Sequence, residues 1–279
     1  MHLTDLLNKL ASPLADVTTT NISGLTVNSA QVKKGDLFFA LLGKTHDGRD
    51  FIDDAIKRGA VAIVTDDRPF NRKQTKTIPA VQTDNPRRVM AKAAARFWPQ
   101  QASLIGAVTG TNGKTSTVDF MRQIWARANW SSISIGTIGM RGDSVNRADT
   151  PMTNITQLTT PDSLNLHASI AAVAKQGVTH LALEASSHGL QQHRLDGLNI
   201  HVAGFTNLSR DHLDHHCNMD EYFAAKLRLF EDLLIEGGGA VINIDDVHGK
   251  KIAERMKNRP ITVKTYGTSK AADFYIKDI

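Results

Sequence analysis

At 279 residues, with 41% hydrophobic and 22% charged residues, the chain has the size and composition of a globular protein of about two domains. A single cysteine, Cys217, excludes an internal disulfide, and a scattered net charge of +5 with only 6% aromatic residues gives no sign of a nucleic-acid surface. The first residues do not read as a secretory signal and no apolar run approaches ~20 residues, so we expect a cytoplasmic protein without membrane insertion.

Residues 1–100 predict a small α/β domain. Buried strands are expected at 36–41 and 60–65, and helices at 51–58 and 86–98. Gly59 follows the first helix, and Pro86 suits the first turn of the second. The segment 99–101 is the expected boundary to a second domain, residues 101–279.

Residues 101–279 alternate between apolar strands and amphipathic helices. The expected strands are 104–109, 132–136, 178–184, 200–206, 239–244 and 261–266. The expected helices are 114–128, 161–175, 218–236 and 246–257. This alternation predicts a mainly parallel sheet with helices on both faces, and ligands beyond the carboxyl ends of its strands. The last residues, 273–279, read as a strand that the chain leaves unfinished, so we expect a further domain to be missing.

A glycine-rich turn follows the strand 104–109 and ends in Gly113-Lys114-Thr115. A strand, such a turn and a helix in this order predict a phosphate-binding loop. Backbone N–H groups and the helix N-terminus face the phosphates, Lys114 adds positive charge, and Thr115 offers a hydroxyl to Mg²⁺. Val108 stands where the Walker pattern has its first glycine, so the loop is a Gly-x-x-Gly-Lys-Thr variant beginning at Gly110. We therefore expect the chain to bind a nucleoside triphosphate.

Two segments after neighbouring strands carry candidate metal ligands. Glu184 ends the strand 178–184, where an acid reaches a Mg²⁺ beside the phosphate loop; the alternative is a surface carboxylate at a strand end. The next strand leads into 207–217, which is rich in histidine and includes Cys217. Zinc is disfavoured, because there is no second cysteine and the spacing is not that of paired knuckles. One histidine completing a Mg²⁺ shell is the favoured interpretation.

Lys226 falls within the apolar arc of the helix 218–236 at about 100° per residue. An unpaired buried ammonium costs several kcal/mol, so one interpretation is that the stem packs and the amine reaches solvent. The other is that a neutral buried amine adds CO₂ and becomes a carbamate, a carboxylate-like metal ligand.

Together these segments resemble the Mur ligases, the ATP-dependent peptide ligases of bacterial cell-wall synthesis. The similar stretches are Gly110-Thr-Asn-Gly-Lys-Thr115, Glu184-Ala-Ser-Ser-His-Gly-Leu-Gln-Gln-His-Arg194, Asn207-Leu-Ser-Arg-Asp-His-Leu-Asp-His-His216 and Tyr222-Phe-Ala-Ala-Lys-Leu227. They are most similar to the members that add diaminopimelate or lysine to UDP-MurNAc-L-Ala-D-Glu. The resemblance extends into the first domain, through 35–41 and 43–48.

The resemblance implies a role for each matching position. ATP would contact Gly110, Thr111, Asn112, Gly113, Lys114, Thr115 and Ser116. The UDP part would face Ser29, Thr45 and His46, and the muramoyl-peptide would face Thr159, Thr160, Ser186, Gln192 and Arg194. Mg²⁺ would be held by Thr115, Glu184, His212 and carbamylated Lys226, with Lys114 and Lys226 as the catalytic lysines.

The resemblance further implies a monomer that forms an acyl phosphate from ATP and the D-Glu carboxylate, which a diamino acid then attacks. Two features depart from the family: Asn28-Ser29-Ala30 replaces a common Asp-Ser-Arg, and the family's third domain is missing, so we expect this chain to be an inactive two-domain fragment. The tetrapeptide Asp-Asn-Pro-Arg at 84–87 begins an expected helix of the first domain, so we assign it no role in selecting the diamino acid. The alternative function is a non-ligating nucleotide-binding remnant or switch protein.

Overall fold

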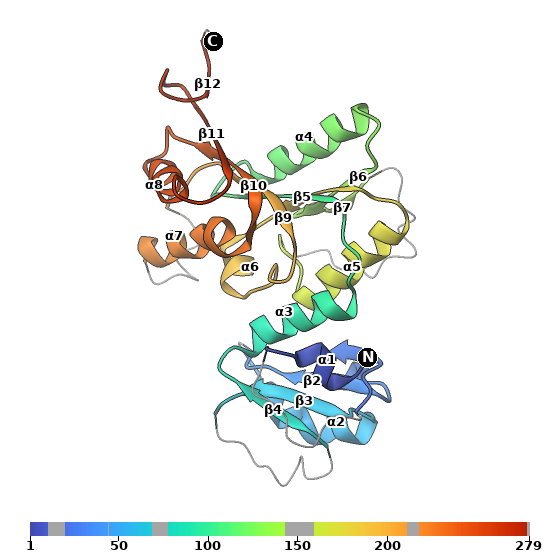
Figure 1. Ribbon diagram of the computed structural model, residues 1–279. Helices are drawn as coiled ribbons and strands as arrows, with labels where there is room; N and C mark the ends of the chain where they lie inside the picture. The colour runs from blue at the N-terminus through green and yellow to red at the C-terminus, as the bar shows by residue number, and fades with distance from the viewer. Residues whose placement is uncertain (11–19, 44, 69–77, 143–158, 211–217, 278–279) are drawn as a thin grey trace. The chain divides into compact units, whose positions relative to one another are not determined.

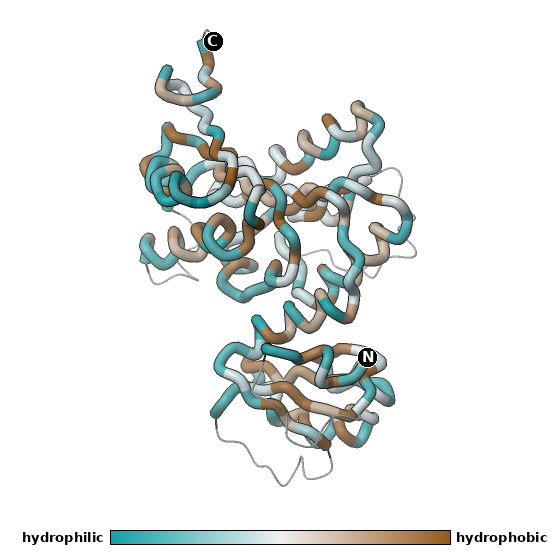
Figure 2. The backbone as a smooth tube through the Cα atoms, in the orientation of Figure 1, coloured by the Kyte–Doolittle hydropathy of each residue, from teal (hydrophilic) through white to brown (hydrophobic). Residues whose placement is uncertain are grey.

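The computed structural model describes residues 1–10, 20–43, 45–68, 78–142, 159–210 and 218–277. The chain divides into two compact units, Met1–Pro99 and Gln100–Ile279 (Figure 1). In each unit the hydrophobic stretches gather on the central strands (Figure 2). Each unit therefore has its own core.

The first unit is a four-stranded parallel sheet with helices. Its strands lie in the order β1 (Gly24–Thr26), β2 (Asp36–Ala40), β3 (Ala62–Asp66), β4 (Ala80–Thr83). Its helices are α1 (Leu3–Leu7), α2 (Ile52–Arg58) and α3 (Pro86–Phe97), with 3₁₀ turns at Ser29–Gln31 and Gly48–Phe51. Gly59 ends α2 in the left-handed conformation, and Asn85 caps α3 by accepting a hydrogen bond from the Arg88 N–H. The short β1, β4 and α1 were not predicted, because three to five residues carry too little periodicity.

The second unit contains an eight-stranded sheet in the order β12-β11-β10-β9-β5-β8-β6-β7. All neighbours are parallel except β7, which pairs antiparallel with β6. The strands are β5 (Leu104–Thr109), β6 (Ser132–Gly136), β7 (Gly139–Arg141), β8 (His180–Glu184), β9 (Ile200–Phe205), β10 (Leu234–Asn243), β11 (Thr262–Gly267) and β12 (Phe274–Tyr275). The predicted mainly parallel sheet is confirmed.

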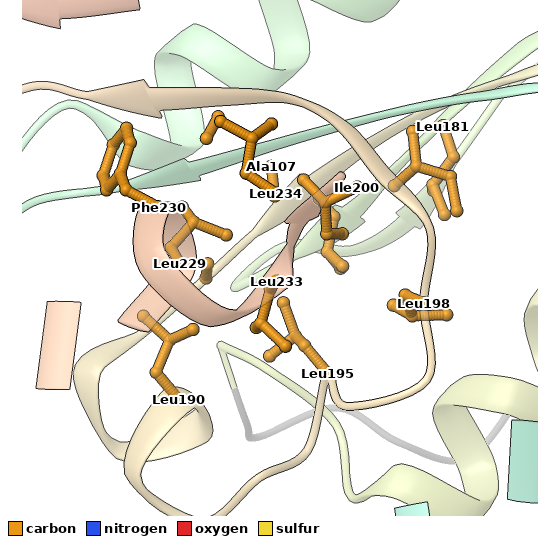
Figure 3. Close-up of a cluster of buried hydrophobic side chains, with 14 of the residues drawn as sticks. Ala107, Leu181, Leu190, Leu195, Leu198, Ile200, Leu229, Phe230, Leu233 and Leu234 are labelled. Carbon is orange, nitrogen blue, oxygen red and sulfur yellow. The ribbon is translucent and has the colours of Figure 1, made fainter. Parts of the chain in front are cut away.

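Helices lie on both faces of this sheet, as predicted. On one face α4 (Lys114–Arg127) packs Val118 against Val108 and Ala182. The opposite face is covered by α5 (Ser163–Lys175), α6 (Ser187–Gln191), α7 (Met219–Arg228), a π-helix (Leu229–Leu233) and α8 (Val247–Met256). Figure 3 shows the core there, with Ala107, Leu181 and Ile200 of the strands among leucines of the covering segments.

Two predicted elements of this unit end differently in the structure. The helix expected over 218–236 ends as an α-helix at Arg228, becomes a π-helix, and gives way to β10 at Leu234. Leu233 ends the π-helix and Leu234 begins β10, yet both are buried, so their hydropathy could not locate the change. Leu234 pairs with Ile200 of β9. Of the strand expected at 273–279, the described residues 273–277 contain only the two-residue β12.

Candidate active site

The phosphate-binding loop joins β5 to α4, as predicted. Gly110 and Gly113 have φ of +152° and +84°, values that favour glycine. A Cβ at Gly110 would lie 1.9 Å from the Thr206 hydroxyl, so no other residue fits there without movement. The sequence pattern thus reflects both backbone conformation and close packing against the segment after β9.

The segment after β9 fixes the first half of the loop. The Thr111 N–H donates to the Asn207 carbonyl (2.8 Å), and the Asn112 N–H donates to the Asn207 side-chain oxygen (3.0 Å). The Thr206 hydroxyl donates to the Asn112 carbonyl (2.6 Å). Because two loop N–H groups are already paired with Asn207, the donors for a phosphate must come from the second half of the loop.

That second half is the N-terminus of α4. Gly113 is its cap residue, and a glycine has no side chain that could cap the helix. The other described helices of ten or more residues are capped by the side chains of Asn85, Asp162, Asn218 and Asp246. The first four N–H groups of a helix have no partner within it and carry the positive end of its dipole. The uncapped start of α4 therefore suits an anion.

The Lys114 ammonium lies across this loop. It donates to the carbonyls of Gly110 (3.0 Å) and Thr111 (2.8 Å). Thr115 and Ser116 follow in the first turn of α4, and the Thr115 side chain is only partly exposed. A cation and a hydroxyl thus stand beside the uncapped N–H groups.

Lys226 is buried in α7, with 1% of its surface exposed, so the prediction from the apolar arc is confirmed and the amine does not reach solvent. Its Nζ donates to the Gly110 carbonyl (2.8 Å) and lies 4.4 Å from the centroid of the Tyr222 ring. A protonated amine that donates hydrogen bonds has no lone pair for a metal. In this form Lys226 supports the loop, and its role as a metal ligand requires chemical conversion.

Glu184 ends β8 with no exposed surface, so the alternative of a surface carboxylate is wrong. Its neighbour across the sheet is Val108 of β5, the strand that leads into the phosphate loop. One carboxylate oxygen accepts from the Thr137 N–H (2.9 Å) and the other from the Thr137 hydroxyl (3.1 Å). A Cβ at Gly136 would lie 2.0 Å from the carboxylate, so that glycine makes room for it.

The five residues expected to face the muramoyl-peptide form a connected group around the end of β8. The Thr160 hydroxyl donates to the Glu184 carbonyl (2.9 Å) and accepts from the Ser186 N–H (3.0 Å). The Arg194 guanidinium donates to the Thr160 carbonyl (2.6 Å) and to the Gln192 side-chain oxygen (2.8 Å). The Thr159 and Thr137 hydroxyls lie 3.1 Å apart. The fold therefore brings together residues up to 35 positions apart in sequence.

The three residues expected to face the UDP part lie in the first unit. Ser29 starts the 3₁₀ turn capped by Asn28, and Thr45 and His46 lie in the turn that follows β2. The His46 carbonyl accepts from the Gly43 N–H (2.9 Å), and its ring packs edge-on against Phe51, with 6.1 Å between the ring centroids. These residues are on loops, where binding residues are commonly found.

His212 lies outside the described residues, as do His215, His216 and Cys217, so the histidine of the expected metal shell is not described. Within the described residues there is no group of three His, Cys, Asp or Glu side chains that could hold a metal ion. Glu184 and Thr115 do supply oxygen atoms, the donors that Mg²⁺ prefers.

The sequence interpretation gave no role to Thr137, Asn207 or Tyr222. Each contacts a predicted residue: Thr137 binds Glu184, Asn207 binds the loop, and the Tyr222 hydroxyl lies 3.2 Å from the Thr111 hydroxyl. Thr137 follows the end of β6 and Asn207 nearly follows that of β9, so position after a parallel strand was the signal that could have found both.

A Gly-Lys-Thr loop at the carboxyl edge of a parallel sheet, with a buried carboxylate and a buried lysine beside it, defines an α/β protein of the phosphate-loop class. Two family models match the chain: the Mur ligase family catalytic domain over residues 21–98 and the Mur ligase middle domain over residues 108–279. The chain belongs to the Mur ligase family.

Two curated relatives of this chain and one solved structure carry the same name. The UDP-N-acetylmuramoyl-L-alanyl-D-glutamate--2,6-diaminopimelate ligase of Bradyrhizobium diazoefficiens is 47% identical over 96% of this chain and 53% of its own length. The ligase of that name from Brucella melitensis is 44% identical over 94% of this chain and 51% of its own length. A solved structure of a ligase of that name gives a TM-score of 0.83 at 31% identity, covering 100% of this chain and 55% of its own. The chain thus spans about half the length of these relatives.

No helix in the described parts of the chain is long and apolar enough to cross a membrane.

Proposed function

We propose that this chain is the substrate- and ATP-binding part of a ligase that adds diaminopimelate to UDP-MurNAc-L-Ala-D-Glu. The names of relatives up to 47% identical support this substrate, with L-lysine as the alternative diamino acid. The observation that carries the proposal is the uncapped start of α4, placed beside Lys114, Glu184 and Lys226.

In this proposal the two units bind different ligands. Residues 1–100 bind the UDP part of the substrate through Ser29, Thr45 and His46, and residues 101–279 bind ATP. The ATP phosphates accept hydrogen bonds from the N–H groups of Gly113, Lys114, Thr115 and Ser116. The N–H groups of Thr111 and Asn112 already donate to Asn207. In this proposal the protein acts in the cytoplasm and as a monomer.

Mg²⁺ fits the oxygen donors on this edge of the sheet. Thr115 and Glu184 would hold it, His212 would complete the shell, and Lys226 would join only as a carbamate. The neutral Lys226 amine forms that group by adding CO₂ with loss of a proton, which turns a cation into a carboxylate-like ligand. Bound there, Mg²⁺ would neutralise charge on the ATP phosphates and the reacting carboxylate.

Thr159, Thr160, Ser186, Gln192 and Arg194 orient the muramoyl-peptide. An oxygen of the D-Glu carboxylate attacks the γ-phosphorus of ATP, the bond to the β-phosphate oxygen breaks, and ADP leaves. The amine of the diamino acid then attacks the acyl carbon, loses a proton, and expels phosphate. Lys114 stabilises the charge on the transferring phosphoryl group, and the site contributes mainly position and charge.

The test uses the whole protein encoded by the gene, incubated with ATP, UDP-MurNAc-L-Ala-D-Glu and meso-diaminopimelate. We expect the UDP-muramoyl-tripeptide by mass spectrometry, with one phosphate released for each amide bond, and little product with L-lysine. Phosphate release without an amide product would favour the non-ligating alternative and would contradict the proposal.

A second arm uses the 279-residue polypeptide alone. We propose that it binds UDP-MurNAc-L-Ala-D-Glu measurably and ATP weakly, without forming tripeptide, because its relatives are about twice as long and the proximity contribution of ~7–11 kcal/mol requires a closed site. Calorimetry and phosphate release measure this. Turnover at an enzyme-like rate of about 1 s⁻¹ would show that these residues suffice.

A further inference from the structure

We propose that Tyr222 is a positioning residue for the phosphate loop, acting on two consecutive loop residues through its hydroxyl and its ring. The inference rests on the proposed role of this loop in nucleotide binding. It concerns a side chain of α7, an element separated from the loop by more than 100 residues of sequence.

Tyr222 is a core residue with a polar end that must find a partner. The side chain has no exposed surface and its ring packs in the main core of the second unit. Its hydroxyl lies 3.2 Å from the Thr111 hydroxyl in the loop. A buried tyrosine hydroxyl without a partner would be costly, so this contact fixes where the ring stands relative to the loop.

The Thr111 hydroxyl has two further contacts, both with Ser209. The Thr111 hydroxyl accepts from the Ser209 N–H (3.0 Å) and donates to the Ser209 carbonyl (3.3 Å). A threonine hydroxyl has one hydrogen and two acceptor positions, so the remaining place is an acceptor. With Tyr222 as the donor to Thr111, all the hydrogen-bonding capacity of the Thr111 hydroxyl is used.

The ring of Tyr222 makes the second contact. Lys226 follows one helical turn later, so both side chains lie on the same face of α7. The Lys226 Nζ lies 4.4 Å from the ring centroid and donates to the Gly110 carbonyl (2.8 Å). In the protonated form of Lys226, the ring face thus holds the cation that binds Gly110, while the hydroxyl holds Thr111.

These two contacts also affect the position of Lys114. The carbonyls of Gly110 and Thr111 are the acceptors of the Lys114 ammonium. If either residue shifts, that ammonium and the start of α4 shift with it, and the loop must be reordered when a nucleotide binds. Tyr222 therefore lowers the cost of ordering the loop, which is how a residue that touches no ligand affects affinity.

The experiment compares Tyr222→Phe, which removes only the hydroxyl, with the wild-type 279-residue chain, using ATP with Mg²⁺ as the probe. We expect ATP affinity to fall roughly five- to tenfold, the effect of one buried hydrogen bond, with unchanged affinity for UDP-MurNAc-L-Ala-D-Glu. The matched control is Tyr266→Phe, which removes the hydroxyl that donates to the Phe205 carbonyl (3.3 Å). Unchanged ATP affinity in Tyr222→Phe, or an equal loss in Tyr266→Phe, would overturn the inference.

A double variant tests the route through Thr111. If Tyr222 acts on the loop through this hydroxyl, Tyr222→Phe combined with Thr111→Val should bind ATP no more weakly than Thr111→Val alone; fully additive losses would contradict it. Amide hydrogen exchange at Thr111 and Asn112, measured without nucleotide, should speed up in Tyr222→Phe and not in Tyr266→Phe. This readout still decides the inference if the wild-type chain binds no ATP, an outcome that would count against the proposed function instead.

Discussion

The Arg228 guanidinium lies 3.1 Å from the Asp196 carboxylate, and this ion pair joins α7 to the turn that follows α6. Asp196 is 3% exposed and also lies 3.2 Å from His193. Arg228 donates to the Leu190 carbonyl of α6 as well. Because Arg194 and Lys226 each lie two residues from this pair, the contact fixes the peptide-facing residues relative to the helix that supports the phosphate loop.

Arg228→Leu should lower the free energy of unfolding by about 3 kcal/mol, since it leaves the Asp196 carboxylate buried without its main cation. The control is Arg255→Leu, which breaks the exposed Arg255–Glu231 pair (2.9 Å) and should cost at most about 1 kcal/mol. Urea unfolding near neutral pH measures both. Equal losses in the two variants would show that the buried Asp196–Arg228 pair contributes no more to the free energy of unfolding than the exposed pair does.

This contribution should persist to low pH. Burial raises the pKa of Asp196, but the hydrogen bond from His193 and the charge of Arg228 outweigh burial, so the pKa lies below its ordinary 3.8. A carboxyl whose pKa is lower in the folded state stabilises the fold above its unfolded pKa and loses that effect as pH falls through the folded pKa. In wild type the contribution of Asp196 should therefore stay constant from pH 7 down to about 4. In Arg228→Leu the buried carboxyl has lost this cation and is stabilised by protonation, so the difference in stability between the two proteins should narrow as pH falls.

His167 should make the protein less stable in mild acid. Burial lowers the pKa of His167 from 6.5 to about 4, although its ring lies 3.1 Å from the Asp196 carbonyl. The unfolded chain therefore takes up a proton first, and stability is lost as pH falls from about 6.5 toward 4.

Between pH 7 and 5 this amounts to about 2 kcal/mol. His167→Gln keeps a donor at this position and removes the titration, so its stability should fall less over the same range. Urea unfolding at the two pH values measures the difference. Parallel losses in wild type and variant would assign the acid sensitivity to other groups.

Lys114→Ala should reduce kcat for ligation by the whole protein roughly a hundred- to a thousandfold. Enzymes lose about this much when one hydrogen-bond donor that stabilises charge in the transition state is removed. The KM for UDP-MurNAc-L-Ala-D-Glu should change little, because Lys114 lies at the phosphate loop and contacts Gly110 and Thr111. Steady-state kinetics separate the two constants, with the exposed Lys175→Ala as the control. An unchanged kcat in Lys114→Ala would show that Lys114 has no role in the reaction.

Carbamylation of Lys226 should be visible by ¹³C NMR when the protein is kept in labelled bicarbonate at neutral or alkaline pH. The Lys226 amine is buried against Gly110, so the signal should vanish in Lys226→Ala and remain in Lys250→Ala, whose lysine is exposed. Lys226→Ala should lose ligation and regain part of it with added short carboxylates. An ammonium at Lys226 in the presence of Mg²⁺ and both substrates would contradict the carbamate.

Local sequence was sufficient for several features of this protein. The strands 104–109 and 132–136 have the predicted bounds, because a short apolar run between turn residues predicts both a buried strand and its limits. The phosphate loop was predictable because its glycines are required by backbone conformation at Gly110 and Gly113. Helical periodicity placed Lys226 on the apolar side of its helix but left open whether the amine reaches solvent, which the structure decides.

Only the tertiary structure decided which strands are neighbours. β9 lies beside β5 although more than 90 residues separate them, and this order brings Asn207 to the loop and Tyr222 to Thr111. Likewise, the Asp196–Arg228 pair depends on how α6 packs against α7. The sequence by itself determined the local conformations and the chemical groups of the site. The structure determined their partners, because contacts between distant segments depend on strand order and helix packing, which no local pattern encodes.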